Sequence, residues 1–537
     1  MYNSIVTFSL GGKEMKKNLL KIITLVAAIG MLASCEIHFG PSSNSKVISA
    51  GLTAGSISKS EGEGFELVDP KYTMRQNSEN AGWNTLNSTG DQKILVVPVK
   101  LSGESSWTQT KLDNVNKVFF GEASDTSWQS VKSFFETSSY GNLHITGEVL
   151  PEFSSSYSYA SLMAKGQSSS DAIAEEFNAK TTLTNDQRKA YDQDGDGYLD
   201  AVVFLYQPVP TDSNSDSFWA WCFATELSAS KLKPAVNNYM WASYDFINDT
   251  YTKDTVFGKV PSGLEAHTYI HETGHLLGLD DYYSYDDSST SKPWDCAGDR
   301  EMQSFNIGDH NIYSKMALGW VDPYYVTGSC EIKLHTSALY GEAILIKDDW
   351  NKSIFDEYLM IEYYTPNGLN KQDSQYSYDS RNKMYEGSGL RIYHIDARLV
   401  KGIYVSGSSY SNRGYSSDWV KNNTIIGASN SLNRSYLTST QAKNGKVRYV
   451  HLLDSGKNNT LSNGVNGTGD YSSITVSKSQ GLKINPDKTL WTKGQTFEAT
   501  SDFFANGTKF NDGTALNYTI TVGETDGDAI TVKITKN

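Results

Sequence analysis

The sequence has little cysteine: only four of its 537 residues are cysteines, namely Cys35, Cys222, Cys296 and Cys330. No CxxC pair is present, so the sequence offers no cysteine-ligated metal cluster. Cys35 ends an apolar N-terminal segment, which leaves three cysteines and at most one disulfide bridge. A disulfide framework is therefore excluded, and the 38% of hydrophobic residues must stabilise the fold through a packed core.

Positive charge is also scarce, because 47 Lys and Arg residues face 61 Asp and Glu residues, a formal net charge of −14. This balance argues against a nucleic-acid-binding surface and fits an acidic protein that tolerates cations. Long apolar runs are absent after the N-terminal segment, so no later part of the chain is expected to cross a membrane. No internal repeat is found, and the length predicts about three or four domains.

The N-terminal segment has the pattern of a signal peptide. The basic residues of MKK, 15–17, precede the apolar run LLKIITLVAAIGMLAS at 19–34. The run ends in LASC, 32–35, which resembles a bacterial lipoprotein box whose cysteine receives the lipid. We therefore expect residues 1–35 to be a lipoprotein signal peptide that anchors the protein through Cys35 in the bacterial cell envelope, outside the cytoplasm. The alternative is an ordinary secretory signal with an incidental cysteine.

The next 300 residues contain both helix and strand patterns. Residues 36–90 are rich in Ser, Gly and Asn without periodicity, which indicates a tether or a short pro-segment. KILVVPVKL at 93–101 predicts an apolar strand. The segment from 130 to 150, SVKSFFETSSYGNLHITGEVL, predicts a helix that ends near Gly141 and then a strand. A polar helix is expected at roughly 170–190.

Beyond Pro323 the helical patterns fade and alternating apolar runs replace them. Examples are EYLMIEYY at 357–364, GLRIYHID at 389–396 and ITVKITK at 530–536, separated by Gly, Asn, Ser and Asp. This pattern is typical of one or two β-sandwich modules.

Histidine is scarce as well, yet three of the nine histidines, His267, His271 and His275, follow one another at intervals of four. On an α-helix this spacing puts them on one face. The outer two are about 12 Å apart along the axis, too far for a single ion with bonds of roughly 2.0–2.1 Å. His271 and His275 form an HExxH motif, in which both imidazoles reach one ion and Glu272 can polarise a metal-bound water.

The residues that follow supply a third ligand. Gly278 is placed to end the helix through a left-handed conformation. Asp281 follows His271 by ten residues and completes HExxHxxGxxD. The motif thus predicts two histidine ligands from the helix and one carboxylate from beyond the glycine turn. His267, one turn upstream, is expected to pack the helix or to support a ligand.

HETGHLLGLDDYY at 271–283 resembles the HExxHxxGLPDxYD signature of the immune inhibitor A family of bacterial zinc metallopeptidases. The resemblance implies zinc ligands at His271, His275 and Asp281, with Glu272 as the general base. Asp280 stands where the family has a proline, which makes it the alternative third ligand.

The resemblance extends over roughly residues 90–450. MQSFNIGDHNIYSKMALGWVDP at 302–323 is similar to the family's segment after the helix, which contains a methionine turn. Met302 is therefore the candidate for the turn beneath the metal, although GDRE just before it departs from the family pattern. The segments SVKSFFETSSYG, FDEYLMIEYYTPNGLN and GLRIYHIDARL also match family elements.

The family resemblance, together with the alternating runs beyond residue 323, predicts a fold and a division of the chain. We expect an α+β zincin-like catalytic domain at 91–323, with a mixed sheet plus an active-site helix. A β-rich domain at 324–450 would pack on it, and a C-terminal β module would follow at 451–537. One or both of these β-rich parts are expected to be of the β-sandwich type.

The resemblance also implies zinc-assisted hydrolysis of protein or peptide substrates. Three protein ligands leave one position for water, whose pKa the ion lowers to about 7. Glu272 would take the water's proton and pass it to the leaving amine. The oxyanion needs a further donor, and four nearby residues are candidates: Tyr282, Tyr283, His310 and Tyr313.

A second cation site is indicated by DQDGDGYLD at 192–200, which matches the first nine positions of a calcium-binding EF-hand loop. Its candidate Ca²⁺ ligands are Asp192, Asp194, Asp196, the Tyr198 carbonyl and Asp200, with Gly197 at the sharp turn. Position 12 is Val203 instead of glutamate and a strand is expected to follow, so an EF-hand domain is excluded. The alternative is a solvated Asp/Gly turn.

Two other functions compete with a lipid-anchored zinc endopeptidase. One is a surface binding lipoprotein with a vestigial zincin domain, which the complete motif argues against. The other is a metal-dependent amidase that acts on cell-wall crosslinks. Chelator-sensitive cleavage of casein or gelatin would separate the endopeptidase from both.

Replacement of Cys35 tests the lipid anchor. Cys35→Ser removes the thiol that receives the lipid, so the protein should move from the detergent phase to the aqueous phase in a detergent partition. Continued partition of the variant into detergent would contradict lipidation and favour the ordinary secretory signal.

Overall fold

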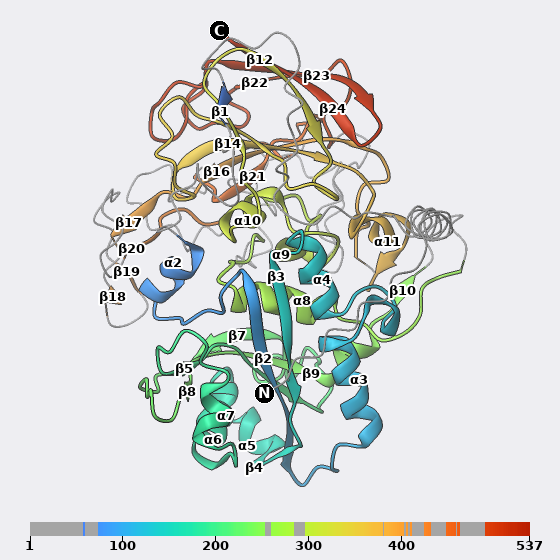
Figure 1. Cartoon of the computed structure of the whole chain (residues 1–537), viewed down its shortest axis with the longest axis vertical. Coiled ribbons are helices and arrows are strands. Elements are labelled where there is room, and N and C mark those ends of the chain that lie inside the picture. Colours follow the sequence, from blue (N-terminus) through green and yellow to red (C-terminus); the bar gives the residue numbers. More distant parts are fainter. Residues whose placement is uncertain are drawn as a thin grey trace, which may run out of the picture. The chain divides into compact units, whose positions relative to one another are not determined.

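The computed structural model describes part of the chain (Figure 1). The described residues are 57–58, 73–252, 259–283, 296–379, 381–401, 404–405, 409–410, 424–430, 447–457, 459–461 and 489–537. Residues 1–35, with Cys35, lie outside them, so the signal peptide stays a prediction. Within the described residues, no helix combines the length and the apolar character that a membrane span needs.

The first sheet contains the strand predicted at 93–101, as part of its central strand β2. Its order is β3-β2-β6-β9-β7, and β4 also pairs with β2. The strands are β2 (Gly90–Ser102), β3 (Leu143–Val149), β4 (Phe153–Ser158), β6 (Val202–Tyr206), β7 (Trp221–Ala224) and β9 (Asn238–Ser243). β2, β3, β6 and β9 run parallel, whereas the edge strand β7 is antiparallel to β9.

Helices cover both faces of this sheet, because its central strands are apolar on both sides. On β2, Ile94 and Val96 enter one hydrophobic cluster, and Leu95 and Val97 enter another. The first cluster includes α3 (Gln109–Phe120), α4 (Val131–Ser138) and α8 (His267–Leu276); the second includes α5 (Tyr159–Met163) and α6 (Ser168–Lys180). Figure 1 shows α3 and α6 on opposite sides of β2.

The predicted helix and strand of residues 130–150 are confirmed as α4 and β3. The single helix expected at roughly 170–190 is instead two helices, α6 and α7 (Asn185–Lys189). The chain breaks between them because the Thr184 hydroxyl accepts the Gln187 N–H at 3.2 Å and starts a new helix.

Apart from β1, two further sheets are built from the chain after residue 323. One has the order β1-β11-β13-β14-β16-β21 and the other β12-β24-β23-β22. Their strands are β1 (Ile57–Ser58), β11 (Tyr324–Val326), β12 (Cys330–His335), β13 (Ile344–Ile346), β14 (Glu357–Tyr364), β16 (Gly389–Asp396), β21 (Val450–Leu452), β22 (Thr496–Glu498), β23 (Tyr518–Asp526) and β24 (Ala529–Lys536). The strands predicted at 357–364, 389–396 and 530–536 are thereby confirmed as β14, β16 and part of β24.

Strand β14 is buried along its whole length because it serves two cores. Leu359 and Ile361 enter a cluster with Ile332 of β12 and Val532 of β24. Tyr358 and Met360, on the other face, enter the cluster that contains α8. This alternation links the downstream sheets to the helix that carries the HExxH motif.

The chain is thus a mixed α and β protein with several sheets, as the α+β prediction requires at the coarse level. β12 shares a sheet with β22, β23 and β24, so residues on both sides of the boundary predicted near 450 are hydrogen-bonded to one another. The boundaries at 323 and 450 remain predictions. Cys222, Cys296 and Cys330 are buried, and none of the three forms a disulfide with another.

Residues 73–90, the described stretch that ends the expected tether, are packed into the fold. Met74 of α2 (Met74–Asn80) and Leu86 are 1% and 0% exposed, in the cluster that contains α8. The Leu86 N–H donates to Leu276 O at 2.8 Å, at the end of α8. This stretch is therefore no free tether, and whether the segment acts as a pro-segment stays a prediction.

Candidate metal centre

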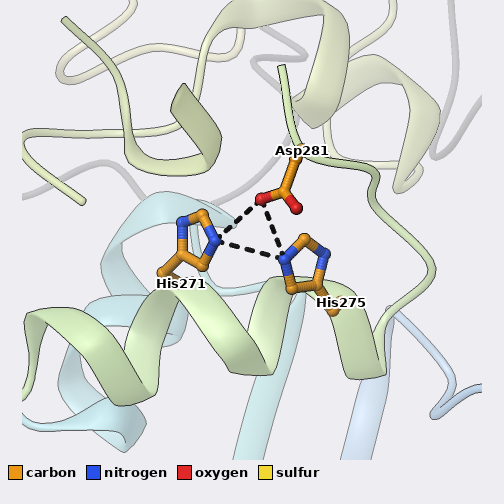
Figure 2. A group of neighbouring side chains, drawn as sticks. All are labelled: His271, His275 and Asp281. Atoms are coloured by element: carbon orange, nitrogen blue, oxygen red, sulfur yellow. Dashed lines mark hydrogen bonds and ion pairs between the residues drawn. The ribbon is translucent and has the colours of Figure 1, made fainter. Parts of the chain in front are cut away.

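Helix α8 presents the HExxH motif and ends where its sequence predicts. Gly278 adopts φ +95°, and the Leu279 N–H donates to Gly274 O at 3.0 Å, which closes the helix through a left-handed turn. The turn directs the following residues back over the helix. Asp281 consequently faces His271 and His275 (Figure 2).

The three side chains form a nearly equilateral triangle. Asp281 Oδ1 lies 3.0 Å from His271 Nε2 and 3.1 Å from His275 Nε2, and the two Nε2 atoms are 3.1 Å apart. Ligands with bonds of roughly 2.0–2.1 Å at tetrahedral angles are separated by about 3.3 Å. The triangle therefore has close to the size that a tetrahedral zinc ion needs for three of its four ligands.

Backbone carbonyls fix the orientation of both imidazoles. His271 Nδ1 lies 2.8 Å from Met302 O, and His275 Nδ1 lies 2.7 Å from Leu279 O. Because a carbonyl only accepts, each Nδ1 carries the hydrogen and each Nε2 of the neutral ring presents a lone pair. Two lone pairs and a carboxylate oxygen thus converge on one point, an arrangement that repels itself unless a cation lies there.

The pKa values of His275 and Asp281 also indicate that the cluster favours a positive charge. Burial opposes a charged imidazole, yet Asp281 raises the pKa of His275 to about 10. Burial likewise opposes a carboxylate, yet His275 and His271 hold the pKa of Asp281 well below its usual range. A proton or a metal ion satisfies the cluster, and only a metal ion uses all three donors.

Glu272 lies beside the triangle and is 5% exposed. Its Oε2 is buried and accepts no hydrogen bond from the described residues, so it is available for a proton or a water. Burial raises the pKa of Glu272, which makes this carboxylate a stronger base than an exposed one. These properties fit a group that accepts a proton during a reaction.

Asp280 is exposed and does not belong to the cluster, whereas Asp281 does. Met302 begins α9 (Met302–Phe305) and is fully buried. Its contribution to the centre is its carbonyl, which orients His271.

The four oxyanion candidates differ in their surroundings. Tyr282 and Tyr313 are fully buried, and their hydroxyls are hydrogen-bonded to Ser314 and Tyr449. His310 has one ring nitrogen 3.2 Å from Ser138 Oγ and the other 3.3 Å from Gln303 Oε1. Tyr283 is only partly buried, and its ring centre lies 6.4 Å from that of His271. Of the four, only Tyr283 is partly exposed.

Two further residues support the centre and were missed in the sequence. Cys222 of β7 donates its thiol hydrogen to Glu272 O over 3.1 Å. Gln303 packs so closely on the helix that a Cβ on Gly274 would lie 2.3 Å from its Oε1. The glycine inside HETGH, Gly274, could have indicated this close approach from the sequence. The contact of Cys222 could not have been predicted, because this cysteine lies 50 residues before Glu272.

The acidic loop predicted to bind calcium brings three carboxylates together, Asp192, Asp194 and Asp200. Gly195 and Gly197 adopt φ +72° and +98°, which lets the loop turn tightly. Burial raises the pKa of Asp200 to about 7, and its acidic neighbours add to the effect. Three carboxylates whose repulsion is only partly relieved, by the ion pair of Arg75 with Asp194, fit Ca²⁺.

Asp196 is not part of this group. One oxygen accepts the Tyr198 N–H at 2.8 Å and the other accepts the Asn84 amide. The expected role of the Tyr198 carbonyl stays a prediction. Arg75 of α2 is hydrogen-bonded to Asp194, so α2 contacts the acidic loop.

A search of protein-family models and a search of curated proteins each find no match for the chain. The function must therefore be argued from the site itself.

The two neighbouring carboxylates can be separated by mutation. Asp281→Ala should reduce zinc from about one ion per chain to near zero after dialysis, because two histidines alone cannot fix tetrahedral zinc. Asp280→Ala should keep its zinc, because Asp280 lies outside the cluster. Metal analysis of both variants is the measurement, and the reverse result would show that Asp280 is the ligand.

Calcium binding can be tested by its effect on stability. Calcium at about 100 times its dissociation constant should stabilise the wild type by about 2.7 kcal/mol. Asp200→Asn should lose most of this gain, whereas Asp196→Asn should keep it, since only Asp200 belongs to the cluster. Thermal unfolding with and without Ca²⁺ measures the effect. A wild type that does not respond to Ca²⁺ would favour the solvated turn.

Proposed function

We propose that the protein is a zinc-dependent endopeptidase. The observation that carries the proposal is the convergence of His271 Nε2, His275 Nε2 and Asp281 Oδ1 within 3.1 Å, with Glu272 buried beside them. Two imidazoles and one carboxylate are a zinc ligand set of hydrolytic enzymes, which keep the fourth position open. The resemblance of residues 271–283 to the immune inhibitor A family supports the same function.

Each residue of the centre has a separate role in the proposed hydrolysis. His271, His275 and Asp281 would hold the zinc ion, which would supply a Lewis acid for the water and the scissile carbonyl. Glu272 takes a proton from the attacking water and returns it to the leaving amine. The Met302 and Leu279 carbonyls hold both histidines with Nε2 toward the ion. Tyr283 is the proposed donor to the oxyanion.

The sheet edge beside α8 favours an extended peptide as substrate. β7 is the last strand in the order of its sheet and packs against α8. An extended chain can add to such an edge through main-chain hydrogen bonds, which recognise a peptide irrespective of its side chains. This edge supports a peptidase more than an amidase that acts on cell-wall crosslinks.

The proposal includes the finer features that the resemblance implies. They are a zincin-like catalytic domain, a β-sandwich arrangement of the downstream sheets, a structural Ca²⁺ at the acidic loop and a lipid anchor at Cys35 that holds the enzyme in the cell envelope. The shared cluster of the second and third sheets supports the sandwich. A binding lipoprotein with a vestigial site is less well supported, because every residue that the reaction needs is present.

The role of Glu272 provides the direct test of the reaction. Glu272→Gln should bind zinc like the wild type but lower kcat for casein cleavage by about 10²–10⁴-fold, the usual contribution of a general base. The matched control is Glu175→Gln, an exposed residue of α6 on the opposite face of the first sheet. Normal zinc content together with unchanged cleavage in Glu272→Gln would refute the proposed mechanism.

A further inference from the structure

A buried histidine outside the ligand set holds the start of α8. His267 is 0% exposed, and its ring is stacked between Trp128 and Tyr378, with ring centres 4.0 and 3.9 Å away. Nδ1 lies 2.8 Å from Glu265 Oε2, and Nε2 lies 3.3 Å from Asp373 Oδ2. Both ring nitrogens thus face carboxylates, and two aromatic faces enclose the ring.

These surroundings favour a positively charged ring. Burial alone would lower the pKa of His267, but Asp373 and Glu265 raise it to about 9. A cation at the first residue of a helix opposes the helix dipole, and Ala266 provides no side-chain cap. The helix start therefore depends on the two carboxylates, and one of them, Asp373, comes from α11 (Asn370–Gln375), 106 residues away.

Asp373 is also hydrogen-bonded to the turn at 306–309, which lies next to α9. Its Oδ2 accepts the Gly308 N–H at 2.6 Å, and its Oδ1 accepts the Tyr251 hydroxyl at 2.8 Å. Asn370, on the same helix, accepts the Asp309 N–H at 3.0 Å. Helix α11 thereby fixes the turn at 306–309.

This turn sets the position of the carbonyl that orients His271. The Asp309 carbonyl accepts the Met302 N–H at 3.3 Å, which ties the turn back to the start of α9. The Met302 carbonyl, in the same residue, then accepts from His271 Nδ1 at 2.8 Å. Asp373 is therefore connected to the ligand by two routes, through His267 along α8 and through Gly308 and Met302.

We propose that Asp373 of α11, acting with His267, is a positioning residue that fixes the orientation of His271 at the zinc centre. The inference rests on the proposed function, and it adds that the chain beyond residue 323 contributes to the centre. Among the described residues, the Asp373 side chain is hydrogen-bonded to Tyr251, His267 and the Gly308 N–H and to none of the three ligands. It acts on the helix start and on the carbonyl behind His271.

The test compares Asp373→Asn with Asp249→Asn in the full chain. Asp249 accepts from the Tyr378 hydroxyl at 2.7 Å in the same aromatic cluster. In the described residues, however, no hydrogen bond joins Asp249 to His267 or to the turn at 306–309. Asp249→Asn therefore alters a carboxylate of the same cluster without touching either route to His271, so a difference between the variants at the metal site reports positioning.

Three readouts are measured: the zinc dissociation constant, the visible spectrum with saturating Co²⁺ in place of zinc, and kcat and KM. Asp373→Asn should weaken zinc binding by about ten- to a hundredfold, as loss of support behind a histidine ligand does. It should also change the Co²⁺ spectrum and lower kcat with little change in KM. Asp249→Asn should leave all three close to the wild type.

Wild-type zinc affinity and an unchanged Co²⁺ spectrum in Asp373→Asn would overturn the inference. If Asp373→Asn does not fold, Tyr251→Phe replaces it, because it removes the hydroxyl that donates to Asp373 and lies 3.1 Å from His267 Nε2. A smaller change in the same direction supports the inference, and no change overturns it. If the wild type binds zinc and cleaves peptides, and Asp373→Asn matches it in all three readouts, the inference is refuted but the proposed function is not. A wild type without zinc refutes the proposed function as well.

Discussion

The centre depends on a repulsion that the fold itself imposes. The Met302 and Leu279 carbonyls fix both histidines so that each neutral ring directs the lone pair of Nε2 to one point, and the turn at Gly278 brings the Asp281 carboxylate to that point. Three acceptors held about 3 Å apart in a buried site are costly without a cation. The surrounding structure must be rigid enough to keep the three acceptors together, and a bound metal ion would offset their repulsion.

Rigidity comes from the position of α8 among several layers. The cluster around it takes side chains from the parallel sheet, from α4 and from β14 of the second sheet. At its C-terminal end, Leu86 caps Leu276 from a segment before the first sheet. At its N-terminal end, Asp373 and Glu265 enclose His267. Both ends of a ten-residue helix are therefore held by distant parts of the chain.

Local features of the site were predictable from the sequence, and distant contacts were not. The spacing of His271, His275 and Asp281 is decided within eleven residues by helix geometry and one glycine turn. The strands β2, β14 and β16 were visible as apolar runs. The role of Asp373 depends on contacts across about a hundred residues, in a short helix within a region that looked entirely β. Asp196 fits the calcium pattern but is turned toward Asn84, a partner that no loop motif specifies.

The central claim is that one zinc ion lies among His271, His275 and Asp281. Crystallography with anomalous data on both sides of the zinc absorption edge tests it most directly. The account predicts a single zinc peak with bonds of roughly 2.0–2.2 Å to two Nε2 atoms and one Asp281 oxygen, and with Glu272 outside the coordination shell. A zinc peak elsewhere in the chain, or none in protein prepared with zinc, would contradict the account.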